Sequence, residues 1–142
     1  MKFRFDENMY GHFREIRPDG ASGTFDFTCR AEADMVRFIQ DRNMRLTGTV
    51  TMEGIAKDAP MEGTLRIDPL SGKELVYDFT FAHDGSRYRF LGRKSVRFMA
   101  PVTSMTNLSG QVERDGVTLA DVDSRFNLLE LPGFLLSFRL GL

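Results

Sequence analysis

Residues 77–90, YDFTFAHDGSRYRF, place an Asp-Gly pair between two runs in which every second residue is aromatic. Asp-Gly is a preferred sequence for a two-residue type I′ turn, because both central positions need a positive φ. A turn at Asp84-Gly85 fixes the register of a β-hairpin, and side chains alternate between its faces. The facing pairs are then Phe81 and Tyr88, Phe79 and Phe90, and Tyr77 and Gly92. The stretch therefore predicts a hairpin with one aromatic face and one solvent-exposed face.

Strand patterns continue through most of the chain, with the spacing of a single antiparallel sheet. Other strands are predicted over residues 2–13 (broken or bulged near Gly11), 23–31, 44–55, 61–67, 103–113 and 117–126. Asp115-Gly116 is a second hairpin turn. The segment EADMVRFIQD, residues 32–41, predicts a helix with one apolar side and Asp34 as a cap. Residues 127–142 fit a strand or a short helix.

Glycines within the predicted strands indicate strong curvature. Gly48, Gly54, Gly63 and Gly92 fall on the apolar side of their strands, where glycine usually marks a bulge, a bend or close backbone approach. Strands that coil to close on themselves need such positions. We therefore predict a mainly all-β single domain over residues 1–142. It is a closed or nearly closed antiparallel barrel of about eight strands, lipocalin-like, with one short helix packed on it or plugging an end.

Composition narrows the classes of partner and compartment. A net charge of −1 over 142 residues provides no general attraction to nucleic acid or anionic membranes. The longest apolar run is far shorter than the roughly 20 residues of a membrane span. Arginines at 87, 89 and 93 alternate with the rings, so they lie on the opposite face and form no stacking platform for nucleic acid. With one cysteine, Cys29, and no signal-peptide pattern, we expect a soluble cytoplasmic protein.

A barrel of this size either fills with side chains or holds one small ligand. We expect the inward glycines to leave space beside large apolar side chains. The predicted ligand-lining residues are Phe25, Phe27, Met44, Gly48, Met52, Met61, Gly63, Tyr77, Phe79, Phe81 and Phe90. An ordinary core rich in Phe and Met explains the same residue types, and this alternative stays open.

Candidate catalytic residues are few. His12 lies beside Gly11 in the first strand, and Asp121 and Asp123 share one strand face, opposite Gly110 and Leu108 in the expected register. A structural histidine and solvent-exposed aspartates are the simpler interpretations. Cys29 alternates with phenylalanines and fits a small core residue. We expect no metal and no cofactor, because no ligand spacing or dinucleotide motif is present.

Three segments carry a resemblance to a known family: FDENMYGHF (5–13), LTGTVTMEG (46–54) and YDFTFAHDGSRYRFLGRKSV (77–96). Together they resemble the small accessory domain that accompanies cholesterol-oxidase-like glucose-methanol-choline flavin oxidoreductases in some bacteria. The likeness covers about residues 5–112. It implies a neighbourhood of steroid or other lipid chemistry and a flavin oxidoreductase as partner, and it brings no catalytic residues to transfer.

Three functions follow as hypotheses. The first is a non-enzymatic module that binds an apolar small molecule such as a sterol, fatty acid or terpenoid. The second is a small barrel enzyme, of isomerase or cyclase type, acting on a lipid-like substrate through His12, Asp121 or Asp123. The third is a barrel with a solid core that serves protein interaction. An apolar void without a buried polar pair favours binding, and a void lined by paired ionisable groups favours catalysis. The oligomeric state is left open.

Overall fold

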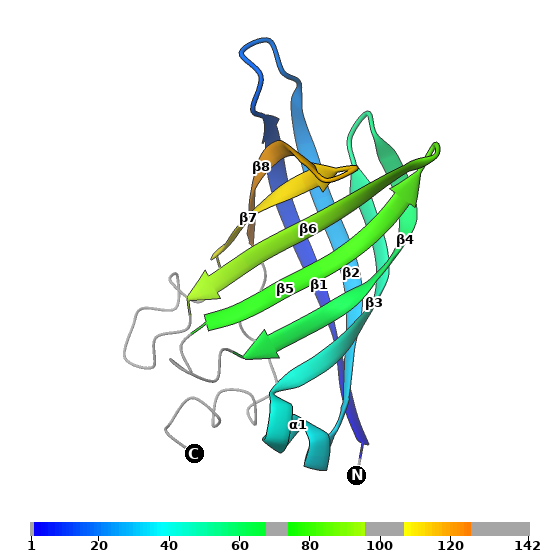
Figure 1. Cartoon of the computed structure of the whole chain (residues 1–142), viewed down its shortest axis with the longest axis vertical. Coiled ribbons are helices and arrows are strands. Elements are labelled where there is room, and N and C mark those ends of the chain that lie inside the picture. The colour runs from blue at the N-terminus through cyan, green and yellow to red at the C-terminus, as the bar shows by residue number, and fades with distance from the viewer. Residues whose placement is uncertain (1, 68–73, 96–106, 126–142) are drawn as a thin grey trace.

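The computed structural model describes residues 2–67, 74–95 and 107–125. Within these ranges, eight antiparallel strands close into a barrel in chain order, and one short helix follows the second strand (Figure 1). The predicted fold class is confirmed. The elements are β1 (Lys2–Glu15), β2 (Ser22–Asp34), α1 (Met35–Asp41), β3 (Asn43–Met52), β4 (Ala56–Ile67), β5 (Glu74–His83), β6 (Ser86–Ser95), β7 (Asn107–Arg114) and β8 (Val117–Arg125).

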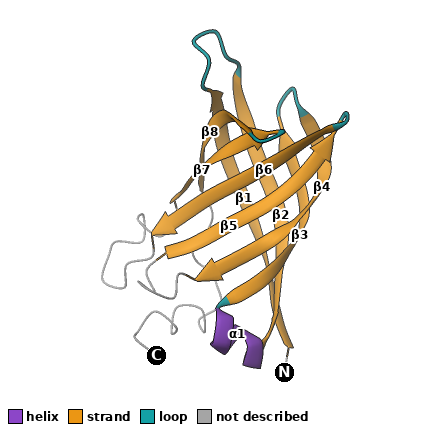
Figure 2. Ribbon diagram, in the orientation of Figure 1, coloured by secondary structure: helices purple, strands orange, loops and turns teal. Residues whose placement is uncertain are grey.

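The two ends of the barrel differ. The turns that join β1 to β2, β3 to β4, β5 to β6 and β7 to β8 lie at one end, called the turn end (Figure 2). At the other end, called the helix end, lie α1, the start of β5 and the end of β6 (Figures 1 and 2). The helix end is therefore where residues early in β5 and late in β6 meet.

Helix α1 is shorter than its sequence pattern predicts. Asp34 caps it as expected, because its carboxylate accepts from the backbone N–H groups of Val36 and Arg37. Residues 32–34, however, continue β2, where pairing with β1 extends to Asp34 and prevails over the helical pattern. Phe38 is buried, whereas Val36 and Ile39 are 62% and 55% exposed. The predicted apolar side of the helix is thus only partly buried.

The β5–β6 hairpin has the predicted register. Phe81 pairs with Tyr88, Phe79 with Phe90 and Tyr77 with Gly92. The turn residues Asp84 and Gly85 have φ values of 49° and 78°, as a type I′ turn requires. On the outer face, Asp78 forms an ion pair with Arg89 at 2.7 Å.

Two strand predictions need correction. β1 pairs with β2 in one uninterrupted register from Lys2 to Arg14, so the break expected near Gly11 is absent. β3 ends at Met52, and Gly54 lies in the following turn with a φ of +77°. The N–H of Ile55 donates to the carbonyl of Met52 and closes that turn. Gly54 is therefore a turn residue and does not face the interior.

The last hairpin is offset by one residue from the expected register. Glu113 pairs with Thr118, but Val112 pairs with Ala120, so Leu119 is an extra residue in β8. This β-bulge shifts every later pair. Asp121 faces Gln111 and Asp123 faces Ser109, so the expected positions opposite Gly110 and Leu108 were wrong. Residues 103–106 and 126–142 lie outside the described part of the chain.

Gly48 and Gly63 lie where the backbone of a neighbouring strand approaches closely, and they do not create interior space. A Cβ on Gly48 would overlap the backbone carbonyl of Thr28, and one on Gly63 would overlap that of Asp78. The backbone of the paired strand lies so close to each of these positions that only glycine fits. The expectation that Gly48 and Gly63 provide room for a ligand is therefore wrong, whereas the close backbone approach expected of strand glycines is observed.

Candidate functional site

The middle and turn end of the barrel interior hold a cluster of aromatic rings. Phe79 lies 5.0 Å, centroid to centroid, from both Phe27 and Phe90, and Phe25 stacks on Phe90 at 5.3 Å. Phe81 stacks on Tyr88 at 5.0 Å. These rings, called the aromatic cluster, are Phe25, Phe27, Phe79, Phe81, Tyr88 and Phe90. Because the rings contact one another, this part of the interior is packed with side chains.

The predicted ligand-lining side chains are in the interior. Nine of them are buried, and the two glycines are the exceptions discussed above. The buried ones are Phe25, Phe27, Met44, Met52, Met61, Tyr77, Phe79, Phe81 and Phe90. Burial alone does not separate a ligand-lining residue from a core residue, so their role in binding stays a prediction.

A buried polar cluster lies beside the aromatic cluster, towards the helix end. The hydroxyl of Tyr77 lies 2.8 and 3.1 Å from the two carboxylate oxygens of Glu7. The Nζ of Lys94 donates to the same hydroxyl at 3.1 Å. Glu7, Tyr77 and Lys94 are all at most 1% exposed. We call these three residues the Glu7–Tyr77–Lys94 cluster.

Three strands bring this cluster together. Tyr77 is near the start of β5, and Lys94 is near the end of β6, two residues beyond the cross-strand partner of Tyr77. Glu7 comes from β1, opposite Cys29 of β2. β8 pairs with β1 only between Tyr10 and Glu15, so among the described residues the portion of β1 that contains Glu7 pairs with β2 alone. Closure of the barrel thus places Glu7 within reach of residues 70 and 87 positions later.

Burial determines the electrostatics of the cluster. It lowers the pKa of Lys94 to about 7, although the negative charge of Glu7 acts in the opposite direction. Burial, and then the charge of Glu7, raises the pKa of Tyr77 well above its ordinary value, so the phenol keeps its proton. Burial also raises the pKa of Cys29 strongly, which keeps that thiol protonated and unreactive. The cluster combines an amine that changes charge near neutral pH with a phenol that stays neutral.

The hydrogen bonds give each group a distinct chemical capacity. The Tyr77 hydroxyl accepts from Lys94 and donates to the Glu7 carboxylate, so a proton can pass between amine and carboxylate through the phenol. The amine can donate hydrogen bonds or, when neutral, act as a nucleophile. This arrangement can orient a polar group of a ligand or transfer a proton to it.

The weak catalytic candidates lie on the outer surface. His12 and Asp123 are exposed cross-strand neighbours on β1 and β8, and Asp123 accepts from Ser109 Oγ at 3.2 Å. Asp121 accepts from Gln111 Nε2 at 3.0 Å and is also exposed. The solvent-exposed interpretation of both aspartates is confirmed. The structure does not bring His12 or these aspartates to the Glu7–Tyr77–Lys94 cluster.

Glu7 and Lys94 were not predicted from the sequence as site residues, although the position of each within its strand carries a signal. Lys94 lies on the same pleat as Phe90 and Gly92, so a charged residue there interrupts an apolar face. Glu7 precedes the inward Met9 by two residues in the same way. Charged residues on an inward pleat are rare without a partner, which makes them candidates for a functional site.

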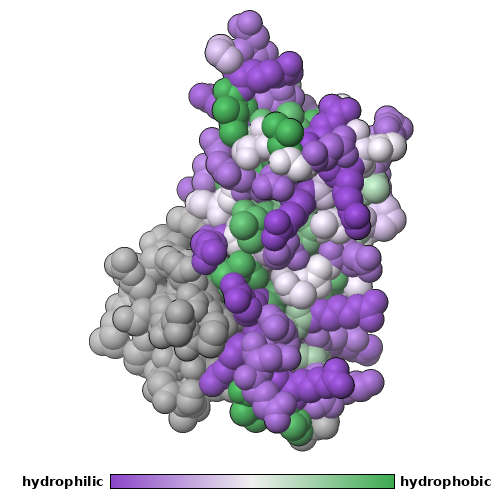
Figure 3. All heavy atoms as spheres, viewed as in Figure 1, coloured by the Kyte–Doolittle hydropathy of each residue, from purple (hydrophilic) through white to green (hydrophobic). Residues whose placement is uncertain are grey.

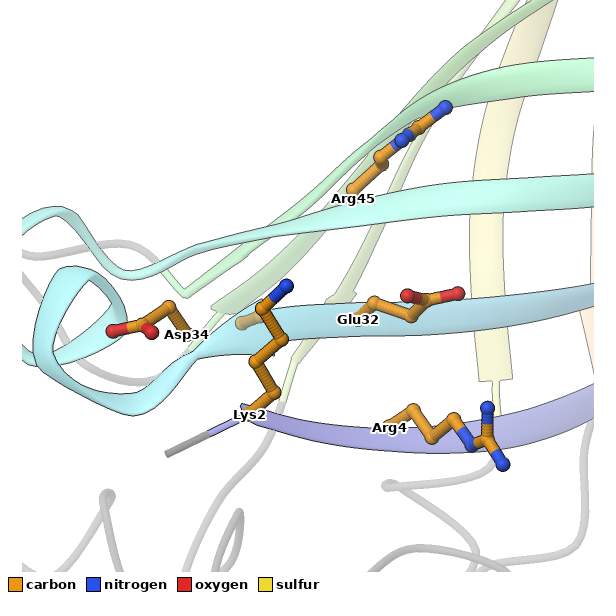
Figure 4. A pocket seen from close by; sticks show the side chains of 6 residues that line it. Lys2, Arg4, Glu32, Asp34 and Arg45 are labelled. Atoms are coloured by element: carbon orange, nitrogen blue, oxygen red, sulfur yellow. The ribbon is translucent and has the colours of Figure 1, made fainter.

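The outer surface carries grooves of mixed charge. One of about 430 Å³ crosses β1, β2 and β3 near the helix end and is lined by Lys2, Arg4, Glu32, Ala33, Asp34 and Arg45 (Figure 4). Glu32 pairs with Arg4 on one side and Arg45 on the other, so the charges alternate across the strands. Exposed apolar residues are interspersed with hydrophilic ones in the view of Figure 3, which is ordinary for a protein surface. The outside therefore offers weaker features than the interior cluster.

Among the described residues, no group of three or more His, Cys, Asp or Glu side chains is arranged to hold a metal ion. No helix in the same part of the chain has the length and apolarity needed to cross a bilayer. Comparison of the chain with protein-family models, with curated proteins and with solved structures finds no match.

Proposed function

We propose that the barrel binds a small, mostly apolar molecule, whose polar end contacts the Glu7–Tyr77–Lys94 cluster. The observation that carries this proposal is the burial of a carboxylate, a phenol and an amine inside an otherwise apolar barrel. Small-molecule sites typically combine apolar walls with a few convergent polar groups. Barrels of about eight strands that hold one small ligand, such as the lipocalins, provide the precedent for such a site.

The cost of the cluster supports a functional role. Well-packed apolar residues in place of a buried ion pair are often neutral or stabilising by about 1 to 4 kcal/mol. A barrel that needed only a stable core would be served by apolar residues at positions 7, 77 and 94. Buried groups with shifted pKa values gather at binding and catalytic sites.

The charges of the cluster indicate the class of ligand. Lys94 and Glu7 offset one another when both are charged, and the cluster becomes negative when Lys94 loses its proton. A ligand carboxylate would meet the like charge of Glu7, which disfavours fatty acids. A hydroxyl or carbonyl group can accept from Lys94 or donate to Glu7 without added charge. We therefore favour sterol-like or terpenoid-like molecules with a neutral polar end.

The aromatic cluster limits where the apolar part of the ligand lies. Ring contacts of 5.0–6.3 Å extend from Tyr77 to Tyr88. The proposed ligand therefore occupies the helix-end side of these rings, where the Tyr77 hydroxyl lies. Packing among the rings also supports the solid-core alternative, in which the outer surface binds a protein. A flavin oxidoreductase remains a proposed protein partner.

An enzymatic function is the second candidate, because paired ionisable groups inside a barrel suit catalysis as well as binding. The Lys94–Tyr77–Glu7 hydrogen bonds also provide a path for proton transfer. In this candidate function, the buried cluster carries the acid–base chemistry of an isomerase in place of His12, Asp121 and Asp123. Turnover of a bound enone or sterol ketone that is lost in Glu7→Gln would favour it over simple binding.

Fluorescent probes test the binding proposal. Dehydroergosterol, with a hydroxyl end, is expected to bind at one site with an affinity nearly insensitive to salt. Parinaric acid, with a carboxylate, is expected to bind more weakly. Tyr77→Phe removes the bridging hydroxyl and should weaken dehydroergosterol binding at least about fivefold, the equivalent of roughly 1 kcal/mol. Tyr88→Phe, in the aromatic cluster at the turn end, is the matched control. Failure of dehydroergosterol to bind, or equal effects of the two variants, would contradict the proposal.

A further inference from the structure

Lys94 differs from the other described lysines. The sequence contains four lysines, at positions 2, 57, 73 and 94. Lys2 and Lys57 are exposed, whereas Lys94 is fully buried, and Lys73 lies outside the described residues. The Nζ of Lys94 lies 5.0 Å from the centroid of the Tyr77 ring and donates to its hydroxyl. An amine is thus held in a fixed position within apolar surroundings.

Amines in such surroundings react with carbonyl compounds when they are neutral. Desolvation in an apolar site is a known way of activating a lysine for imine formation. Among the described residues, the ionisable groups that act on Lys94 include Glu7, Tyr77 and Cys29. Burial outweighs the charge of Glu7 and brings the pKa of Lys94 to about 7, so a large fraction of the amine is neutral at neutral pH.

We infer that Lys94 forms a reversible imine with an apolar aldehyde bound in the barrel. This inference rests on the proposed function and specifies its ligand class, since an aldehyde is a neutral polar end on an apolar molecule. The cluster supplies the three parts of the chemistry: a nucleophile in Lys94, a proton donor in Tyr77 and a proton acceptor in Glu7.

The reaction balances without an oxidant or reductant. The Nζ lone pair attacks the carbonyl carbon, and a C–N bond forms as the C=O π bond breaks. The carbonyl oxygen takes one of the two protons of Nζ, which gives a neutral carbinolamine. Tyr77 then donates its proton to the hydroxyl as the C–O bond breaks. The nitrogen loses its remaining proton to Glu7, which returns one to Tyr77. One aldehyde and one amine give one imine and one water, and Glu7 and Tyr77 are unchanged.

Reductive trapping tests the inference. The folded protein is incubated at pH 7 with dodecanal and cyanoborohydride, and the dodecylated lysines are located and quantified by peptide mass spectrometry. A lysine with a pKa near 7 has roughly a thousandfold more neutral amine than an exposed one, part of which is offset by lower nucleophilicity. We expect labelling at Lys94 to exceed that at Lys57 by at least about tenfold. In urea-unfolded protein the two should label equally.

Variants and a competitor separate the possible outcomes. Lys94→Arg keeps a hydrogen-bond donor but cannot form the imine, and should lose the dominant adduct, whereas Lys57→Arg should keep it. If Lys94→Arg does not fold, the ratio between folded and unfolded wild-type protein still decides. Dodecan-1-ol should compete with dodecanal for the site. If dodecanal and dodecan-1-ol both displace bound dehydroergosterol but no adduct forms on Lys94, the imine is overturned and the proposed function stays intact. Absence of binding by both compounds would overturn the two together.

Discussion

The Nζ of Lys94 and the hydroxyl of Tyr77 lie 3.1 Å apart inside the barrel, and the same amine lies 5.0 Å from the centroid of the tyrosine ring. A hydrogen bond at this site holds a lysine whose pKa is about 7 in the folded protein, compared with an ordinary value of 10.5. Between these two values the unfolded chain binds more protons than the folded one. Stability linked to Lys94 therefore rises with pH above about 7 and is reduced as the pH falls towards 7.

The first prediction concerns this pH dependence. From pH 7.0 to 8.5 the free energy of unfolding should increase by about 1 to 2 kcal/mol through loss of the proton from the buried Lys94–Glu7 pair. Lys94→Met removes the titrating group, so the variant should lack this increase. Urea unfolding at several pH values, with Lys57→Met as the control, measures the difference. Parallel pH profiles for wild type and Lys94→Met would show that the amine titrates normally in the fold.

The second prediction concerns the centre of the aromatic cluster. Phe79→Ala removes a ring that lies 5.0 Å from both Phe27 and Phe90 and is fully buried. The expected loss is about 3 to 5 kcal/mol, as for other large-to-small changes in packed cores. Chemical denaturation provides the measurement. A loss below about 1 kcal/mol would mean that the ring borders a space that tolerates its removal.

The third prediction concerns the close approach of the β2 backbone to Gly48 of β3. Gly48→Ala places a methyl group against the backbone carbonyl of Thr28, which cannot move without disturbing the β2–β3 pairing. We expect a loss of about 2 kcal/mol or more. Thr49→Ala, at the next and exposed position of β3, should cost less than about 1 kcal/mol. Similar thermal midpoints for the two variants would contradict this close backbone approach at Gly48.

The fourth prediction concerns a buried hydroxyl. Ser124 is 2% exposed, and its Oγ has no hydrogen-bond partner among the described residues. A buried hydroxyl without a partner costs about 1 to 3 kcal/mol in desolvation. Ser124→Ala should therefore leave stability unchanged or increase it by about 1 kcal/mol. A clear decrease in the free energy of unfolding would indicate that the hydroxyl has a partner.

Much of the fold could be predicted because its signals are local. Asp84-Gly85 fixes both a turn and the register of ten cross-strand pairs, and alternation then assigns each ring to a face. The last hairpin shows the limit of this reasoning. Its turn was identified, but the bulge at Leu119 has no signature in the sequence and shifts Asp121 and Asp123 by one residue.

The candidate site was harder to predict because it depends on distant contacts. His12, Asp121 and Asp123 attract attention by residue type, yet strand pairing places them outside. Glu7 and Lys94 have ordinary residue types for a surface, and only their pleat marks them as inward. That Glu7 reaches Tyr77 follows from closure of the whole barrel, which no local pattern specifies.

The order of the strands has a consequence for biosynthesis. Every pairing in the described barrel joins strands that are consecutive in the chain, except the one between β1 and β8, which brings Tyr10 beside Arg125. Strands can therefore add one after another as the polypeptide leaves the ribosome, but the edge of β1 between Tyr10 and Glu15 stays open until β8 is made. Closing so long a loop costs entropy and slows folding. During that interval, the open edge of β1 can pair with another nascent chain unless it is protected.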